Sequence, residues 1–302
     1  MKRSIVLMAA LMAAFALGAC KKKEAPPPPP PTPAAAAPQA APAPAAAPAP
    51  TPTPAAVAPA APAPSGPKWV QALPQRAPTA KVGDVVWAMV PRPNEEYSKA
   101  FGAMKVEAVT GNSVTLAGDF NAKHEGVPAA VLQPVAQGPS TLKVGDIATL
   151  VKFGSPSLGI VTKVDGRKVT LKHDFAGGLS ETTTEDAFAL VAGVAPHAWV
   201  HHKGQGANTS RYKGFVVAVE GDKAWVLTGS GLVEITEKAD AKPLTFKTAY
   251  KVGQKVIGYI PAYSDVTISK VIKPGFQYEA LWKVGGKDVP KKFFFHDLLE
   301  QL

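Results

Sequence analysis

The sequence contains a single cysteine, Cys20, among 302 residues. No disulfide can therefore form within the chain, and the thiol must serve another purpose. The chain also lacks long apolar runs after its first 20 residues, because no later segment approaches the roughly 20 residues that a helix needs to cross a bilayer. We therefore expect no membrane span after Cys20.

The usual catalytic motifs are missing as well. The chain has no Gly-x-Ser-x-Gly elbow, no His-Glu-x-x-His and no glycine loop that would cradle a phosphate. His197, His201 and His202 lie close in sequence, but adjacent residues on one strand point to opposite faces, which disfavours a metal site. The pairs His173-Asp174 and His296-Asp297 should diverge for the same reason. We therefore expect no enzyme, no metal and no cofactor.

The N-terminus has the three parts of a secretory signal: Lys2 and Arg3, an apolar stretch over residues 5–17, and small residues before Cys20. The segment Leu17-Gly18-Ala19-Cys20 resembles the lipobox of bacterial lipoproteins. That resemblance implies that residues 1–19 are removed as a signal peptide and that Cys20 carries several acyl chains, which anchor a protein better than one chain does. The alternative is an ordinary cleaved signal with an incidental cysteine.

The residue after the cysteine bears on location. In the lipoprotein family an Asp at that position tends to retain the protein at the inner membrane, whereas here Lys21 follows. The resemblance therefore implies an anchor in the outer membrane with the protein facing the periplasm. Display on the cell surface is the alternative.

Residues 20–67 form the predicted tether, of which residues 25–67 are almost entirely Ala and Pro without one charge. Such a segment cannot build a core, and proline favours extended polyproline II at about 3.1 Å per residue, or roughly 130 Å in total. The segment is either a featureless tether or a spacer that holds the folded part away from the membrane. Recognition of the proline run at residues 26–31 by a peptide-binding groove is a third reading.

The rest of the chain is repetitive. A Val-x-Gly-x-x-(Val/Ala) pattern recurs around Gly111, Gly166 and Gly221, 55 residues apart each time, and Gly275 follows 54 residues later. Each glycine separates two β-rich runs, where a tight hairpin needs a positive φ. The sequence therefore predicts a hairpin in each of four units.

A second repeat precedes three of the hairpins, in which Lys-Val-Gly-(Asp/Gln) at residues 81–84, 143–146 and 251–254 opens an apolar strand. Val194-Ala195-Pro196 occupies that slot in the third unit. Each unit ends in a short apolar cluster, such as Leu298-Leu299, that would close a small barrel. The sequence thus predicts an all-β fold of four units, at residues 78–138, 139–194, 195–247 and 248–302.

The order of these signals resembles the small SH3-like barrels of the Tudor type. The resemblance implies four tandem binding modules, although the Asn-Val-Arg-Ser-Gly-like stretch of bacterial SH3 modules is missing and only some units would offer an aromatic cage. A 60-residue domain buries only about 60% of its unfolded surface. We therefore expect neighbouring barrels to pack against each other.

Aromatic residues supply the candidate ligand site. Trp225 takes the register of Thr115 and Thr170, between inward-facing residues, so alternation predicts that it points out of its barrel. With Trp199 and Tyr212 it would form a stacking platform for a sugar, a peptide or a cation. The alternative is that Trp225 packs against a neighbouring barrel. Tyr259, Tyr263 and Tyr278 form a second candidate set, and Trp87, matched to Trp199, is expected in the core.

The charge points to the partners. The formal net charge is +10, and the C-terminal unit carries four lysines around an apolar stretch: Lys283, Lys287, Lys291 and Lys292. They are either a solvated rim or a surface for an anionic wall polymer, and the export signal argues against nucleic acid. We expect a lipid-anchored envelope protein that binds a protein or a wall polymer, or else a purely structural adaptor. The sequence leaves the oligomeric state open.

Overall fold

The computed structural model describes residues 66–92, 95–118, 122–136, 138–152, 154–175, 178–203, 211–260 and 262–300. Internal contacts divide the chain into Met1–Ala58 and Pro59–Leu302, and every described residue belongs to the second unit. The predictions for the signal peptide, Cys20 and almost all of the Ala/Pro-rich segment lie outside the described residues. Among the described helices, none is long and apolar enough to span a membrane.

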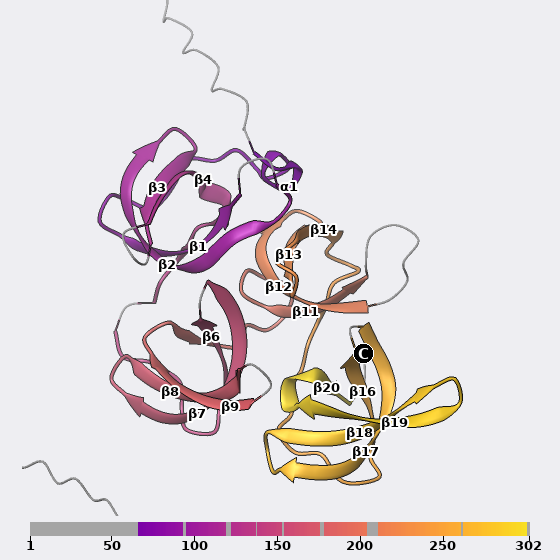
Figure 1. Cartoon of the computed structure of the whole chain (residues 1–302). Helices are drawn as coiled ribbons and strands as arrows, with labels where there is room; N and C mark the ends of the chain where they lie inside the picture. The colour runs from indigo at the N-terminus through magenta and orange to yellow at the C-terminus, as the bar shows by residue number, and fades with distance from the viewer. Residues whose placement is uncertain are drawn as a thin grey trace, which may run out of the picture. The chain divides into compact units, whose positions relative to one another are not determined.

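The described part is almost entirely β-structure, arranged as four five-stranded antiparallel sheets (Figure 1). The first repeat contains β1 (Val85–Pro91), β2 (Ser98–Thr110), β3 (Ser113–Ala117), β4 (Lys123–Pro128), the 3-10 turn η2 (Ala129–Val131) and β5 (Gln133–Pro134). The second contains β6 (Ile147–Lys152), β7 (Ser155–Asp165), β8 (Lys168–Phe175), β9 (Gly178–Thr184) and β10 (Ala187–Ala189).

The third repeat contains β11 (Trp199–Lys203), β12 (Arg211–Glu220), β13 (Lys223–Thr228), β14 (Val233–Glu237) and β15 (Lys242–Pro243). The fourth contains β16 (Lys255–Ile260), β17 (Ala262–Lys273), β18 (Gln277–Val284), β19 (Lys287–Phe294), the 3-10 turn η3 (Phe295–Asp297) and β20 (Leu298–Leu299). In all four sheets the first strand pairs with both the second and the fifth, while the third and fourth strands extend the meander. This topology confirms the predicted fold class of four small all-β repeats.

The predicted hairpins are present in every repeat. Gly111, Gly166, Gly221 and Gly275 all adopt positive φ between paired strands. At Gly111 the φ is 56°, and the strands on either side meet at Thr110 and Ser113. A two-residue loop with Gly in its first position gives the twist that a hairpin requires. The glycine spacing therefore located one hairpin in each repeat correctly.

The second strand of each repeat contains a β-bulge. The pairing register shifts after Val106, Val161, Val216 and Ile268, which hold equivalent places in the four sheets. A bulge bends its strand and increases the local twist. The second strand of every repeat is therefore interrupted by a bulge at an equivalent position.

The turn before each first strand closes by the same hydrogen bonds, and the third repeat departs from the others there. Gly83 donates its N–H to the Val106 carbonyl at 2.9 Å, and His197 donates to the Val216 carbonyl at 2.7 Å. His197 therefore occupies the glycine position, with a φ of 72° that only this non-glycine residue adopts among the described residues. When the two repeats are aligned on this turn, Trp199 is equivalent to Val85, and His201 is equivalent to Trp87. The predicted match of Trp87 with Trp199 is thus wrong by two residues, although Trp87 is a core residue at 5% exposure.

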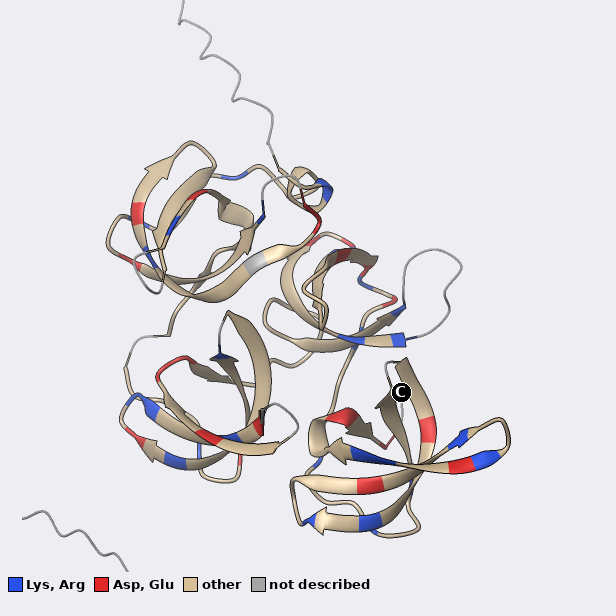
Figure 2. Ribbon diagram, in the orientation of Figure 1, with Lys and Arg blue, Asp and Glu red and all other residues tan. Residues whose placement is uncertain are grey.

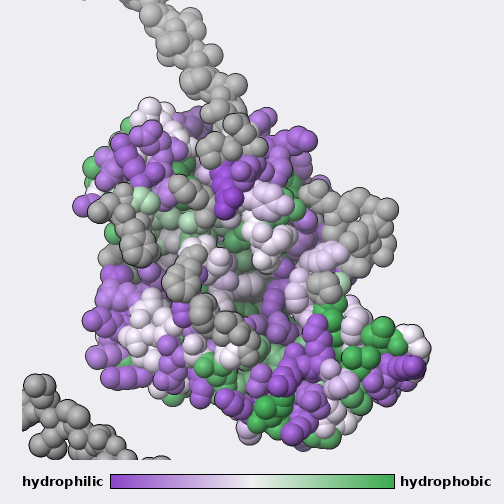
Figure 3. All heavy atoms as spheres, viewed as in Figure 1, coloured by the Kyte–Doolittle hydropathy of each residue, from purple (hydrophilic) through white to green (hydrophobic). Residues whose placement is uncertain are grey.

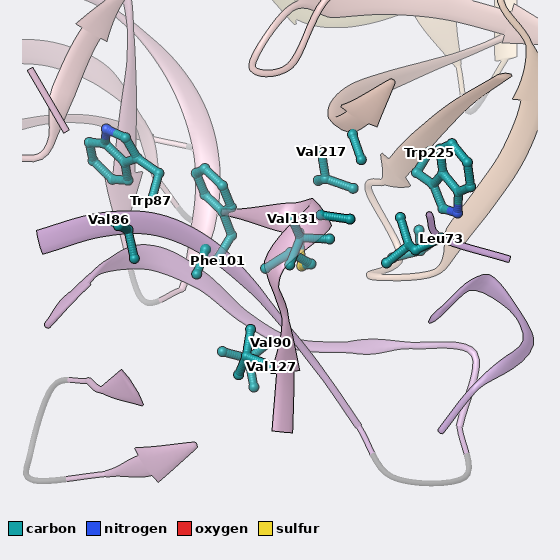
Figure 4. Close-up of a cluster of buried hydrophobic side chains, with 14 of the residues drawn as sticks. Leu73, Val86, Trp87, Val90, Phe101, Val127, Val131, Val217 and Trp225 are labelled. Atoms are coloured by element: carbon teal, nitrogen blue, oxygen red, sulfur yellow. The ribbon is translucent and has the colours of Figure 1, made fainter. Parts of the chain in front are cut away.

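A short helix, α1 (Lys68–Gln71), precedes the first repeat and contributes to its packing. Trp69 and Leu73 join one hydrophobic cluster with Phe101 of β2 and with Val217 and Trp225 of the third repeat. Figure 4 shows Leu73, Val131, Val217 and Trp225 gathered in this cluster. The first and third repeats therefore share a core, as expected for units too small to be stable alone.

Candidate functional site

The structure contains a cavity of about 840 Å³ lined by residues from all four repeats. The first repeat contributes Tyr97 and Ser98, and the second contributes Asp174. Trp199 and Phe215 come from the third repeat, and the fourth contributes Tyr259, His296 and Asp297. The volume suits a small-molecule ligand or a few residues of a polymer. We call this space the junction cavity.

Four charged or titratable side chains converge at the junction cavity. His296 Nε2 lies 2.7 Å from Asp174 Oδ1, and His296 Nδ1 lies 3.3 Å from Asp297 Oδ1. Lys213 Nζ donates to Asp297 Oδ1 at 2.8 Å and lies 3.2 Å from His296 Nδ1. We call Asp174, Lys213, His296 and Asp297 the charged cluster. The prediction that His296 and Asp297 diverge was wrong, because η3 turns both side chains toward Lys213.

The two carboxylates decide the protonation of the charged cluster. Burial by itself disfavours a charged His296, but the Asp297 charge and the hydrogen bond to Asp174 raise its pKa above the ordinary value. Burial likewise disfavours a charged Asp297, yet Lys213 and His296 hold the pKa of its carboxyl far below the usual range. In the imidazolium form both ring nitrogens donate to carboxylates. The cluster then joins the second, third and fourth repeats with balanced charge.

Two of the predicted aromatic residues line the junction cavity. The Tyr259 ring lies beneath Lys213, with the ammonium 5.4 Å from the ring centroid. Trp199 donates its indole N–H to Thr149 Oγ1 at 2.9 Å and packs edge-on against Phe215 at 5.4 Å. The hydrogen bond to Thr149 fixes the indole across the boundary between the second and third repeats. The cavity thus combines aromatic faces with paired charges.

Trp225 is the clearest correction to the sequence-based site. Its neighbours Ala224 and Val226 belong to the third repeat's own core, so the indole points out of the barrel as predicted. It is nevertheless only 1% exposed and donates to the Trp69 carbonyl at 2.9 Å. The stacking platform therefore does not exist at Trp225, because α1 covers it. The alternative of packing against a neighbouring element is the one observed.

The other predicted residues lie around the third and fourth repeats. The Tyr263 ring contacts Tyr259 at 5.1 Å and His201 at 6.4 Å, and its hydroxyl is buried. Tyr212 is half-buried beside His202, with ring centroids 6.4 Å apart. Tyr278 is a core residue at 1% exposure. Tyr259 and Tyr263 therefore form a pair, but Tyr212 and Tyr278 do not line the junction cavity.

The neighbouring histidines are buried on opposite faces of β11, as alternation predicted. His201 accepts a hydrogen bond from Arg211 Nη1 at 3.2 Å, whereas His202 Nδ1 lies 3.6 Å from Glu234. Burial lowers the pKa of His201 to about 4, with Arg211, His202 and Lys242 adding to the effect. Over the described ranges, no group of three or more His, Cys, Asp or Glu side chains is arranged to hold a metal ion.

The four lysines of the fourth repeat lie on the β18–β19 hairpin, where Figure 2 shows acidic residues among the basic ones. Lys283 pairs with Asp288 across the strands, and Lys292 pairs with Glu279. Val284 and Val289 are 44% and 41% exposed, and Figure 3 shows hydrophobic atoms beside hydrophilic ones in this region. Two of the four lysines therefore have an acidic residue as their cross-strand neighbour.

Comparison with known proteins adds no relative. No protein-family model matches the chain, and a search of curated proteins gave no significant match.

The charged cluster presents fixed charges of both signs at the wall of the junction cavity. Both ring nitrogens of His296 face carboxylates, and Lys213 is held by Asp297. The Tyr259 ring lies beside these charges at the cavity wall.

Proposed function

We propose that the chain is a lipid-anchored binding protein of the bacterial cell envelope, and that the four repeats act together to receive a segment of protein or wall polymer. The junction cavity carries this proposal, because its lining comes from every repeat. A ligand there would contact the aromatic faces of Trp199 and Tyr259 and the charged cluster. Four independent modules would instead each carry a site of their own.

The anchor part of the proposal rests on Leu17-Gly18-Ala19-Cys20, which resembles a lipobox. Acyl chains on Cys20 would hold the protein at the outer membrane, facing the periplasm or displayed on the surface. The Ala/Pro-rich segment that follows would separate the anchor from the repeats by up to roughly 130 Å. Such a reach would bring the repeats to a wall polymer or to another envelope protein.

A structural adaptor without a small ligand is the second candidate. The burial of Trp225 between α1 and the third repeat favours the adaptor, because an outward-facing aromatic residue that was predicted to bind a ligand is used for packing. The two candidates differ at the junction cavity. An adaptor would tolerate changes to the cavity wall that leave the fold intact, and a binding protein would not.

The experiment is photo-crosslinking in intact cells from a residue at the cavity wall. A photoreactive amino acid at Ser98 would sample the junction cavity, and one at Val252, which is 64% exposed and does not line the cavity, would serve as the matched control. Binding predicts a defined adduct from Ser98 that is missing from Val252. The same random adducts from both positions, with no retention on purified cell wall, would contradict the proposal.

Catalysis is not part of the proposal. His296→Gln should therefore weaken the retention of the protein on wall material. If the native chain releases any wall fragments, the variant should release them equally well. Release of new fragments by the native chain that disappears in His296→Gln would require the charged cluster to be an active site.

A further inference from the structure

A second cavity, of about 550 Å³, lies between the third repeat and the end of the fourth. Its lining includes His201 from β11, Arg211 from β12, Lys242 from β15, and Lys247 and Glu300. Three of these five side chains are cations and one is an anion. Spacing along the chain does not predict this cluster, because the cations are spread over 37 positions.

The strand register explains why the cations meet. His201 pairs with Lys213 on one side and with Lys242 on the other, so all three side chains share a face of the sheet. Arg211 lies two residues before Lys213 on β12 and therefore projects from the same face. Figure 2 shows Lys and Arg at the start of β12. Basic residues thus follow one another across three adjacent strands.

The cations differ in how they are neutralised. Lys247 forms an ion pair with Glu300, and Lys213 forms one with Asp297. Neither Arg211 nor Lys242 forms an ion pair with an acidic side chain among the described residues. Arg211 instead donates to His201, which is 3% exposed. A buried neutral imidazole holds the guanidinium in place but does not balance its charge.

We propose that Arg211, Lys242 and the buried His201 form a binding site for a phosphate group. The guanidinium fork matches phosphate oxygens bidentately, and the ammonium on the neighbouring strand adds a point charge. The bond from Arg211 to His201 orients the fork before a ligand arrives. The cavity volume leaves room for the sugar or polyol that carries the phosphate.

The phosphate site and the junction cavity are two separate cavities, and they are lined by neighbouring positions of the same strands. Lys213 and Trp199 line the junction cavity, while Arg211 and His201 lie two residues further along the same strands. An extended phosphate-bearing polymer would therefore reach both cavities. The phosphate site does not depend on what occupies the junction cavity, so each proposal can fail without the other.

The test is a titration of the mature chain carrying Cys20→Ala with inorganic phosphate at constant ionic strength, followed by NMR. The double variant Arg211→Gln/Lys242→Gln should bind at least tenfold more weakly. Lys287→Gln removes one charge from an exposed hairpin position and serves as the control, with an affinity within twofold of the parent. Equal binding by the double variant, or an equal loss in the control, would overturn the proposal.

A second readout separates recognition from folding. A bound phosphate brings negative charge beside His201, so it should raise the pKa of that ring from its low starting value in the parent chain. The double variant should show no such response to phosphate while keeping the parent's melting temperature within a few degrees. A His201 ring that ignores phosphate in the parent chain would place the anion elsewhere and refute the site.

The source of the phosphate is decided by three probes. Tighter binding of soluble poly(glycerol phosphate) than of inorganic phosphate would identify a polymer, and binding only to phosphatidylglycerol vesicles would identify a lipid headgroup. Equal affinity for all forms would identify free phosphate. Binding of none of the three at millimolar concentration would reject the proposal.

Discussion

The indole N–H of Trp225 donates a 2.9 Å hydrogen bond to the carbonyl oxygen of Trp69, a residue 156 positions earlier. The bond joins β13 of the third repeat to α1, which precedes the first. It ties the beginning of the described chain to a repeat that is not its neighbour in sequence. The third repeat is therefore packed together with α1 and the first repeat in one hydrophobic cluster.

We expect Trp225→Ala to lower the free energy of unfolding by about 3–5 kcal/mol, the usual cost of deleting a large buried aromatic side chain. Trp225→Phe should cost less, since it keeps most of the apolar contact and loses the hydrogen bond to Trp69, worth about 1 kcal/mol. Guanidinium denaturation measures both. Val252→Ala, at a 64% exposed position, should change stability by less than about 0.5 kcal/mol. A Trp225→Ala protein as stable as this control would contradict the shared core.

The charged cluster should make stability depend on pH in a defined direction. Because the pKa of His296 is raised in the folded state, its contribution is complete below the unfolded value of about 6.5 and is lost as pH rises through the folded pKa. Asp174→Asn removes the negative charge beside Nε2 and should lower the pKa of His296. The variant should be about 1–2 kcal/mol less stable than the parent at pH 5.5, with a smaller difference at pH 9.

Urea denaturation at the two pH values and NMR titration of the His296 ring measure this effect. Asp165→Asn removes an exposed carboxylate from the same repeat and should leave the pKa of His296 unchanged. A difference between parent and Asp174→Asn that grows with rising pH would show that His296 is neutral in the fold.

His197 combines a strained backbone with a buried ring. Its φ is 72°, and the ring lies among Trp87, Phe101, Phe188 and Phe215 with centroids 5.0–6.2 Å away. Its Nε2 is buried without a hydrogen-bond partner in the described part of the chain. His197→Gly should relieve the backbone strain, worth about 1 kcal/mol, but leave a void among four aromatic rings. We expect a net loss of about 1–3 kcal/mol at pH 7.

The same residue should contribute to acid sensitivity. Burial lowers the pKa of His197 to about 4, so the unfolded chain binds the extra proton first as pH falls below 6.5. The parent should therefore lose up to about 3 kcal/mol between pH 6.5 and 4 through this ring, and His197→Gly should not. The two stabilities should converge toward pH 4, as followed by thermal denaturation. If the stabilities of parent and variant instead fall in parallel between pH 6.5 and 4, His197 does not cause the acid sensitivity.

Replacement of Cys20 by Ala should release intact repeats from the membrane. The resemblance to a lipobox makes Cys20 the site of acylation, and the acyl chains supply the anchoring energy. Fractionation and immunoblotting should find the variant in the soluble periplasmic fraction with unchanged binding in solution. Continued recovery with the membrane would mean that the basic surfaces, and not the acyl chains, hold the protein there.

The regular features of the fold could be predicted because they depend on local chemistry. Gly111 and its equivalents need positive φ whatever surrounds them, and the apolar segment at Leu298–Leu299 pairs with the first strand of its own repeat. Alternation also placed Trp225 outside its barrel. The match of Trp87 with Trp199 failed at the first turn of the third repeat, because His197 holds a position that glycine fills in the other repeats. No spacing rule predicts that substitution.

The sequence by itself determined four all-β units, their hairpins and the amphipathic alternation of their strands, since each depends on residues within one repeat. Only the tertiary structure decided which outward-facing residues are free and which are covered. Trp225 became a core residue because α1 lies over it, and Asp174 met His296 across 122 positions because different repeats share one boundary. Contacts between repeats depend on packing over long sequence separations, which leaves no periodic trace in the chain.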